Sequence, residues 1–253
     1  MAIKQTQLFN DEIYHIILRA VGDSSVFNNQ DDYYRGIFSI YEFNNSNFVE
    51  IRLRRRQRKK EKFLEPQRKS CGSPTPANFS QNMSDDSIDK RDKLVEILAF
   101  VFMPNHVHLL LRQLKDDGIS KFMQKFGGGY ANYFNKKYER KGHLFNRFKS
   151  IYIKDDDQLK TVFAYIHTNP LSFIEPGWKE NGIKDEGKAI KFLEEEYRWS
   201  SHFDYLGKKN FTSVTNRDFL SEIMGGEQGC KDAVRNWIEY KKDINNFGDI
   251  NLE

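Results

Sequence analysis

Two histidines stand two positions apart in the apolar stretch FMPNHVHLLL, which runs from Phe102 to Leu111. They are His106 and His108. In a β-strand, side chains at i and i+2 leave the same face, so both imidazoles would point at one place. Two neutral imidazoles at this spacing can share a metal ion, but a His-x-His pair in a strand is more often packed in a core or exposed at a surface. The spacing alone leaves both interpretations open.

A tyrosine in the next helical segment is the second candidate. Tyr130 continues a stripe of apolar residues at helical spacing, so we expect it to face the sheet that carries the histidines. The stripe consists of Ile119, Phe122, Met123 and Phe126. Three glycines, Gly127 to Gly129, precede Tyr130, and each costs about 1 kcal/mol relative to alanine inside a helix. They could admit a nucleic-acid backbone, form a hinge or allow close packing, and Tyr130 could equally be a core tyrosine whose hydroxyl has a partner.

Hydrophobic periodicity predicts the elements that would position these residues. Strands are expected over 13–21, 94–103, 106–112 and 145–154, and helices over 31–41, 118–138 and from 155–157 to 170. This order indicates an α+β fold, a ferredoxin-like antiparallel sheet with helices packed on one face. Further helices near 189–196 and 216–240 would form a helical C-terminal extension. We therefore expect one domain over 1–175 and the extension over 176–253.

A basic and polar insertion interrupts this plan. The segment from Ile51 to Lys62 contains eight Lys or Arg, in a chain whose net charge is +4. Residues 65–92 are rich in Pro, Ser, Asn and Asp, and they cannot bury enough apolar surface to offset their ordering entropy. We therefore expect a flexible insertion at about 51–92. Its charge favours a polyanionic partner, with Arg54, Arg55 and Arg56 as candidate contacts, although a solvated basic helix or linker would show the same pattern.

Composition narrows the class of protein further. The chain has 253 residues, of which 38% are hydrophobic, and two cysteines, too few for a disulfide framework. The longest apolar run, Ile97 to Met103, is far shorter than a membrane span, and the first residues lack the apolar core of a signal peptide. No GxxxxGK[ST] motif for nucleotide binding occurs. We expect a cytoplasmic protein without a membrane partner.

Four segments follow one another between Tyr14 and Leu206. They are AFVFMPNHVHLLLRQL, GGGYANYFNKKYERKGHLFNRFKSIYI, YIHTNP and YRWSS. In this order they resemble the single-tyrosine HUH transposases, IS200-like and REP-associated tyrosine transposases in particular. The resemblance implies a metal-dependent enzyme that cleaves and rejoins single-stranded DNA near hairpins through a 5′-phosphotyrosine. It makes 1–175 the catalytic domain, His106 and His108 ligands of magnesium or manganese, and Tyr130 the nucleophile.

One position departs from the family pattern. In related transposases a polar residue one helical turn after the tyrosine helps to hold the metal, but the residue four positions after Tyr130 is Phe134. The nearest amide, Asn135, lies about 140° around an ideal helix from Tyr130, so it serves as a third ligand only if the helix is distorted. Tyr133 lies on the same stripe and is the alternative nucleophile.

Basic residues in and before the fourth strand are the expected contacts to DNA phosphates. They are Arg140, Lys141, Arg147, Lys149 and Lys154. In the segment YIHTNP, His167 and Asn169 are predicted to stabilise the end of a helix.

Two other functions remain open. One is a nickase of the relaxase or replication-initiator kind, with the same chemistry and a different DNA partner. The other is a non-catalytic, domesticated protein that binds DNA by sequence or by hairpin, and the presence of Phe134 favours it. The partner in each case is single-stranded or hairpin DNA. A homodimer in which Tyr130 acts on the histidines of a second copy is also open.

Overall fold

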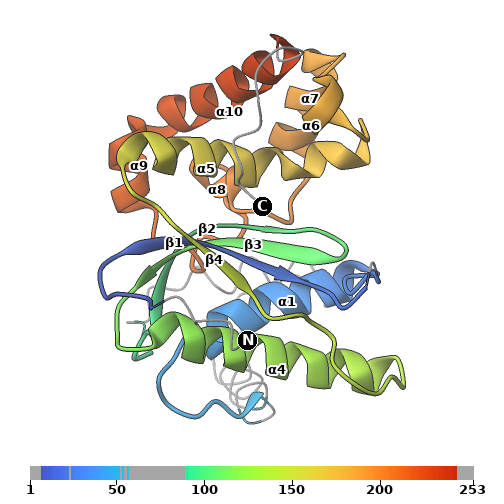
Figure 1. Cartoon of the computed structure of the whole chain (residues 1–253), viewed down its shortest axis with the longest axis vertical. Helices are drawn as coiled ribbons and strands as arrows, with labels where there is room; N and C mark the ends of the chain where they lie inside the picture. The colour runs from blue at the N-terminus through green and yellow to red at the C-terminus, as the bar shows by residue number, and fades with distance from the viewer. Residues whose placement is uncertain are drawn as a thin grey trace, which may run out of the picture.

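The core of the protein is a four-stranded antiparallel sheet with strand order β2-β3-β1-β4 (Figure 1). The computed structural model describes residues 7–22, 24–51, 53, 56, 89 and 91–243. The strands are β1 (Ile13–Arg19), β2 (Val95–Phe102), β3 (His106–Gln113) and β4 (Lys149–Tyr152). Helix α1 (Gln30–Phe43) connects β1 to β2, and α4 (Gly118–Lys137) connects β3 to β4. This order along the chain and across the sheet is ferredoxin-like, so the predicted α+β fold is confirmed.

The ends of the elements follow from local chemistry. The side chain of Asn29 accepts a hydrogen bond from Asp32 N at 3.2 Å and caps α1, and Asp155 accepts one from Gln158 N at 2.8 Å and caps the next helix. The fourth strand is shorter than predicted. Regular pairing with β1 covers only Lys149–Tyr152, and Phe145 forms an isolated bridge with Ala20.

Helices cover both faces of the sheet, which differs from the prediction of one covered face. Helices α1 and α4 lie on one face, and α5 (Asp156–Thr168) lies on the other with the C-terminal helices (Figure 1). Side chains of β3 therefore alternate between two apolar cores: Leu109 and Leu111 contact the α1 and α4 core, and Leu110 contacts the α5 core. A strand that is covered on both faces has a nearly continuous apolar sequence, as β3 does from Val107 to Leu111.

The extension after residue 175 packs on α5. It contains short helices and one long one: α6 (Trp178–Asn181), α7 (Glu186–Lys191), a π-helical turn (Phe192–Glu196), α8 (His202–Tyr205), α9 (Asp218–Met224) and α10 (Gly226–Asp243). Phe163 of α5 and Val234 of α10 belong to the same buried cluster. The predicted helix over 216–240 is broken in two at Gly225, whose φ of 81° is left-handed. The domain boundary near residue 175 stays a prediction.

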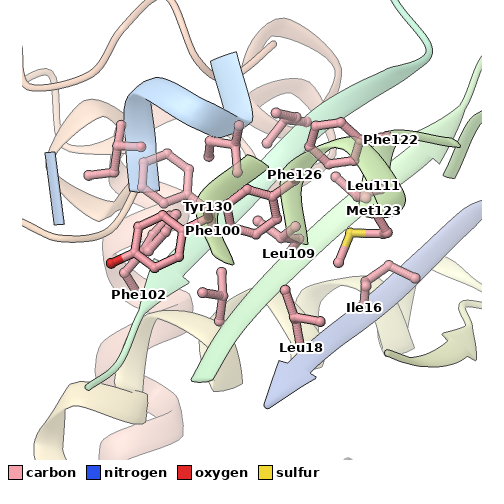
Figure 2. Packing of buried hydrophobic residues seen from close by; sticks show 14 of the residues in the cluster. Ile16, Leu18, Phe100, Phe102, Leu109, Leu111, Phe122, Met123, Phe126 and Tyr130 are labelled. Carbon is pink, nitrogen blue, oxygen red and sulfur yellow. The ribbon is translucent and has the colours of Figure 1, made fainter. Parts of the chain in front are cut away.

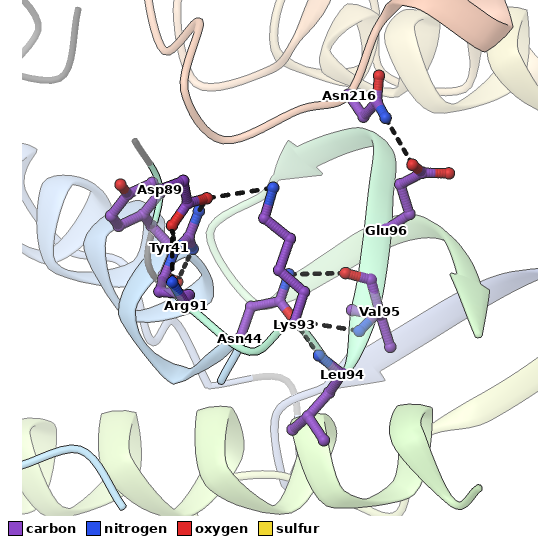
Figure 3. Close-up of polar contacts among 9 residues, drawn as sticks. All are labelled: Tyr41, Asn44, Asp89, Arg91, Lys93, Leu94, Val95, Glu96 and Asn216. Carbon is purple, nitrogen blue, oxygen red and sulfur yellow. Dashed lines mark hydrogen bonds and ion pairs between the residues drawn. The ribbon is translucent and has the colours of Figure 1, made fainter. Parts of the chain in front are cut away.

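The chain that flanks the basic insertion is tied to the fold on both sides (Figure 3). Asn44, just after α1, donates to Val95 O at 2.8 Å and accepts from the backbone N of Leu94 and Val95 at 3.0 and 3.1 Å. Arg91 bonds to Asp89 at 2.6 Å and covers the ring of Tyr41 at 3.5 Å. Most of the insertion, with Arg54 and Arg55, lies outside the described residues; Arg56 is described and exposed.

No helix in the described ranges is long and apolar enough to cross a membrane.

Candidate metal and nucleophile site

The two predicted histidines lie on the same face of β3. The ring centroids of His106 and His108 are 4.9 Å apart. A third histidine, His15 of β1, joins them: its Nε2 lies 2.9 Å from Nδ1 of His108, and the two rings stack at 5.0 Å. The antiparallel register explains the meeting, because Ile17 pairs with His108 and His15 is the next residue on that face. His15 was not predicted; its alternation with the apolar residues of IYHIILR was the available signal.

His108 is held in the neutral state that a metal ligand requires. Burial, followed by the nearby His15 and His106, holds the pKa of His108 well below its ordinary value, so the ring is neutral at neutral pH. Its Nε2 is buried and has no hydrogen-bond partner among the described residues. Nδ1 of His106 lies 2.6 Å from Oδ1 of Asn105, which can only accept, so this nitrogen carries a hydrogen and Nε2 is the ring nitrogen that could bind a metal.

These two Nε2 atoms fit a divalent ion, with Nδ1 of each ring held by an outer residue, as is usual for histidine ligands. A cluster of three or more His, Cys, Asp or Glu suited to a metal does not occur in the described part of the chain.

Tyr130 does not lie with the histidines. It faces the sheet as predicted, but α4 covers the face lined by Leu109 and Leu111, and the histidines leave the opposite face. Its side chain is fully buried, its hydroxyl donates to Val26 O at 2.6 Å, and burial holds its pKa well above the ordinary value. Figure 2 shows the ring packed among Phe100, Phe102 and Phe126. The expected proximity was wrong, and Tyr130 has the surroundings of a core tyrosine.

The other residues predicted on α4 also lie away from the histidines. Tyr133 donates to Oδ1 of Asp32 on α1 at 2.9 Å. Asn135 donates from Nδ2 to Gly142 O at 2.9 Å, in the connection to β4. Helix α4 continues without a break through its glycines, so no distortion turns Asn135 toward a metal, and its expected place as third ligand was wrong.

A different tyrosine lies over the histidines. Tyr165 of α5 is 4% exposed, and its ring centroid lies 5.7 Å from that of His108 and 6.0 Å from that of His15. Lys179 of α6 donates to its hydroxyl at 3.0 Å. Asn169, four residues after Tyr165, is buried and donates from Nδ2 to Tyr165 O at 2.9 Å.

The spacing Y-x-x-x-N in YIHTNP was the sequence signal that could have identified Tyr165, which was not predicted. It places an amide one helical turn after a tyrosine, which is the arrangement missing at Tyr130 and Phe134. His167, by contrast, faces away into the core, where its Nε2 lies 2.8 Å from Oγ of Ser201. That agrees with the structural role expected for it.

The predicted basic contacts gather at the β4 edge of the sheet. Lys141, Arg147, Lys149 and Lys154 are exposed and Arg140 is partly buried. Lys149 pairs with Ile17, which in turn pairs with His108, so Lys149 leaves the same face as the histidines. Arg19, which was not predicted, pairs with His106 and is exposed on that face. The two cations lie beside the histidines, where a phosphate backbone would be attracted.

A family model described as "Transposase IS200 like" matches residues 87–169. No curated protein matches the chain. Among solved structures, the "Structure of the REP associates tyrosine transposase bound to a REP hairpin" aligns with 86% of this chain and 93% of that chain, at 13% identity and a TM-score of 0.45. The matched residues 87–169, which contain both histidines of the pair together with Tyr165 and Asn169, are similar to the IS200-like transposases.

Proposed function

We propose that this protein is a metal-dependent transposase that cleaves and rejoins single-stranded DNA through a covalent phosphotyrosine, with Tyr165 as the nucleophile. The observation that carries the proposal is the position of Tyr165, whose ring lies 5.7 Å from His108 on the face that both histidines share. Its role replaces the one expected of Tyr130. The match of residues 87–169 to the IS200-like transposase model supports a DNA-processing function, and the chemistry of the site supports the finer assignment.

His106, His108 and Asn169 are the residues that would hold the divalent ion. When bound, a magnesium or manganese ion supplies positive charge to the oxygens of the scissile phosphate. Imidazole suits manganese better than magnesium, which prefers oxygen ligands, and an amide oxygen of Asn169 would serve either. His15 would fix the ring of His108 through the bond at Nδ1, 2.9 Å long.

The chain's own residues account for the rest of the reaction. The Tyr165 oxygen forms a bond to phosphorus, the bond from phosphorus to the 3′ oxygen breaks, and a 5′-phosphotyrosine and a 3′-hydroxyl result. The ester keeps the free energy of the phosphodiester, so a second 3′-hydroxyl can reverse the step and join strands. Arg19 and Lys149, exposed on the histidine face, would hold the flanking phosphates.

The test is a covalent adduct assay with metal-supplied protein and 3′-labelled single strands that carry hairpins. The label must be at the 3′ end, because the tyrosine would retain the 5′ phosphate of the downstream piece. Tyr165→Phe should abolish the labelled adduct while DNA binding survives, and Tyr133→Phe should leave it intact. An adduct that persists in Tyr165→Phe would refute the assignment.

The arrangement of site and tyrosine in one chain supports cleavage in cis. A mixture of Tyr165→Phe and His108→Ala proteins should then form no adduct, because each lacks a part that the other cannot supply. Restored adduct in the mixture would instead show that the tyrosine acts across a dimer. Dimerisation itself stays a prediction.

The two alternative functions differ from a transposase in the steps after DNA binding. The presence of Phe134 favoured a non-catalytic protein, but Asn169 stands at the equivalent turn after Tyr165. A metal-loaded protein that binds hairpin strands without cutting them would restore the non-catalytic function. A nickase would cut but fail to join the product to a second strand, which a two-substrate joining assay reveals.

A further inference from the structure

One cation touches the proposed nucleophile directly. Lys179 lies in α6, ten residues beyond the segment that matches the family model, and its Nζ is 3.0 Å from the Tyr165 hydroxyl. The same ammonium group lies 4.9 Å from the centroid of the Tyr165 ring. The C-terminal extension, to which the sequence assigned no function, therefore reaches the site through this side chain.

The position of Lys179 is determined by its neighbours. Trp178 is 1% exposed and belongs to the core that also contains Leu159 and Phe163 of α5, so α6 is anchored beside the helix that carries the tyrosine. Gly177, with φ of 81°, allows the sharp entry into α6 that only glycine adopts without strain. The lysine thus extends from a fixed backbone toward Tyr165.

The hydrogen bond between Lys179 and Tyr165 can run in only one direction. An ammonium group has three donors and no acceptor, so the tyrosine oxygen must accept from Lys179, and the tyrosine's own hydrogen points elsewhere. A hydroxyl held in this way has lost rotational freedom before DNA arrives. The positive charge also lies where negative charge grows as the phosphate is attacked.

We propose that Lys179 is a catalytic residue of DNA cleavage, which holds the Tyr165 hydroxyl for attack and balances the charge that develops on the tyrosine and phosphate oxygens. The inference rests on the proposed function of Tyr165. The phenol proton passes to solvent and the leaving 3′ oxygen takes one up, so the step needs no further reactant. The extension after residue 175 is then part of the active site.

The experiment compares single-turnover cleavage by the full-length protein with Lys179 replaced by Met, Ala and Arg. Methionine keeps an apolar stem against the Tyr165 ring and removes the charge. The control is Lys184→Ala, because Lys184 is exposed, lies five residues further on and carries the same charge. DNA dissociation constants and melting temperatures are measured for each variant with Mn²⁺ supplied.

Lys179→Met and Lys179→Ala should lower the single-turnover rate by about 100-fold. The dissociation constant should change far less, the melting temperature should stay near that of the parent, and arginine should restore part of the rate. Lys184→Ala should cleave like the parent. A Lys179→Met protein that cleaves within about twofold of the parent would overturn the inference, as would a rate loss that accompanies loss of folding and is equal in the arginine variant. If Tyr165→Phe removes the adduct while Lys179→Met does not change the rate, only the lysine inference fails.

Discussion

Replacing Tyr130 and Tyr165 by phenylalanine, one at a time, should distinguish a core tyrosine from a catalytic one. Tyr130→Phe deletes only the oxygen that donates to Val26 O at 2.6 Å in a fully buried position. The carbonyl of Val26 loses this donor in an apolar environment, which costs about 1–3 kcal/mol of unfolding free energy. For a chain of this size each 1 kcal/mol lowers the melting temperature by about 2–4 °C.

Tyr165→Phe should behave in the opposite way. The hydroxyl of Tyr165 accepts from Lys179, which is only partly buried and regains water when the contact is lost. Its stability should therefore change by less than about 1 kcal/mol. Urea unfolding and the adduct assay on both variants form a crossed test: Tyr130→Phe should lose stability and keep the adduct, and Tyr165→Phe should keep stability and lose it. A Tyr130→Phe protein with parental stability and no adduct would refute the reasoning.

Other single side chains give three more expectations. Burial lowers the pKa of His202 from 6.5 to about 3, so the folded state binds fewer protons than the unfolded state between these pH values. The contribution of neutral His202 to the unfolding free energy is therefore intact above pH 6.5. It is lost as the pH falls toward 3, by about 1.4 kcal/mol per pH unit. His202→Leu should flatten the decline of unfolding free energy between pH 6 and 4, and an unchanged slope contradicts the assignment. Gly128→Ala should raise the unfolding free energy by up to about 1 kcal/mol, because an added methyl group meets open space there. Gly129→Ala should lower the unfolding free energy, because the methyl group would lie 2.3 Å from the ring of Phe43. Equal effects of the two substitutions in urea unfolding would show that the available space is not the cause. His108→Ala should weaken Mn²⁺ binding by more than about tenfold, measured by electron paramagnetic resonance of the free ion, and parental affinity would exclude this histidine as a ligand.

Much of the architecture could be read from local pattern. Alternation and helical periodicity predicted the four strands and both helices of the ferredoxin-like unit, because these periods depend only on backbone geometry. The shared face of His106 and His108 results from the same two-residue period. The order of family segments indicated the class of protein, which the match over 87–169 supports.

The tyrosine that lies over the histidines could not be predicted from local sequence pattern. A strand has two faces, and its own sequence does not say which helix covers which one when both faces are buried. Helix α4 packs on the leucine face of β3 and α5 on the histidine face, so Tyr130 enters the core and Tyr165 meets His108. The sequence alone determined the elements and the histidine pair. Tertiary packing decided which tyrosine lies over that pair, and it added His15 and Lys179 from distant parts of the chain, because antiparallel register and helix packing set contacts between residues that no local period connects.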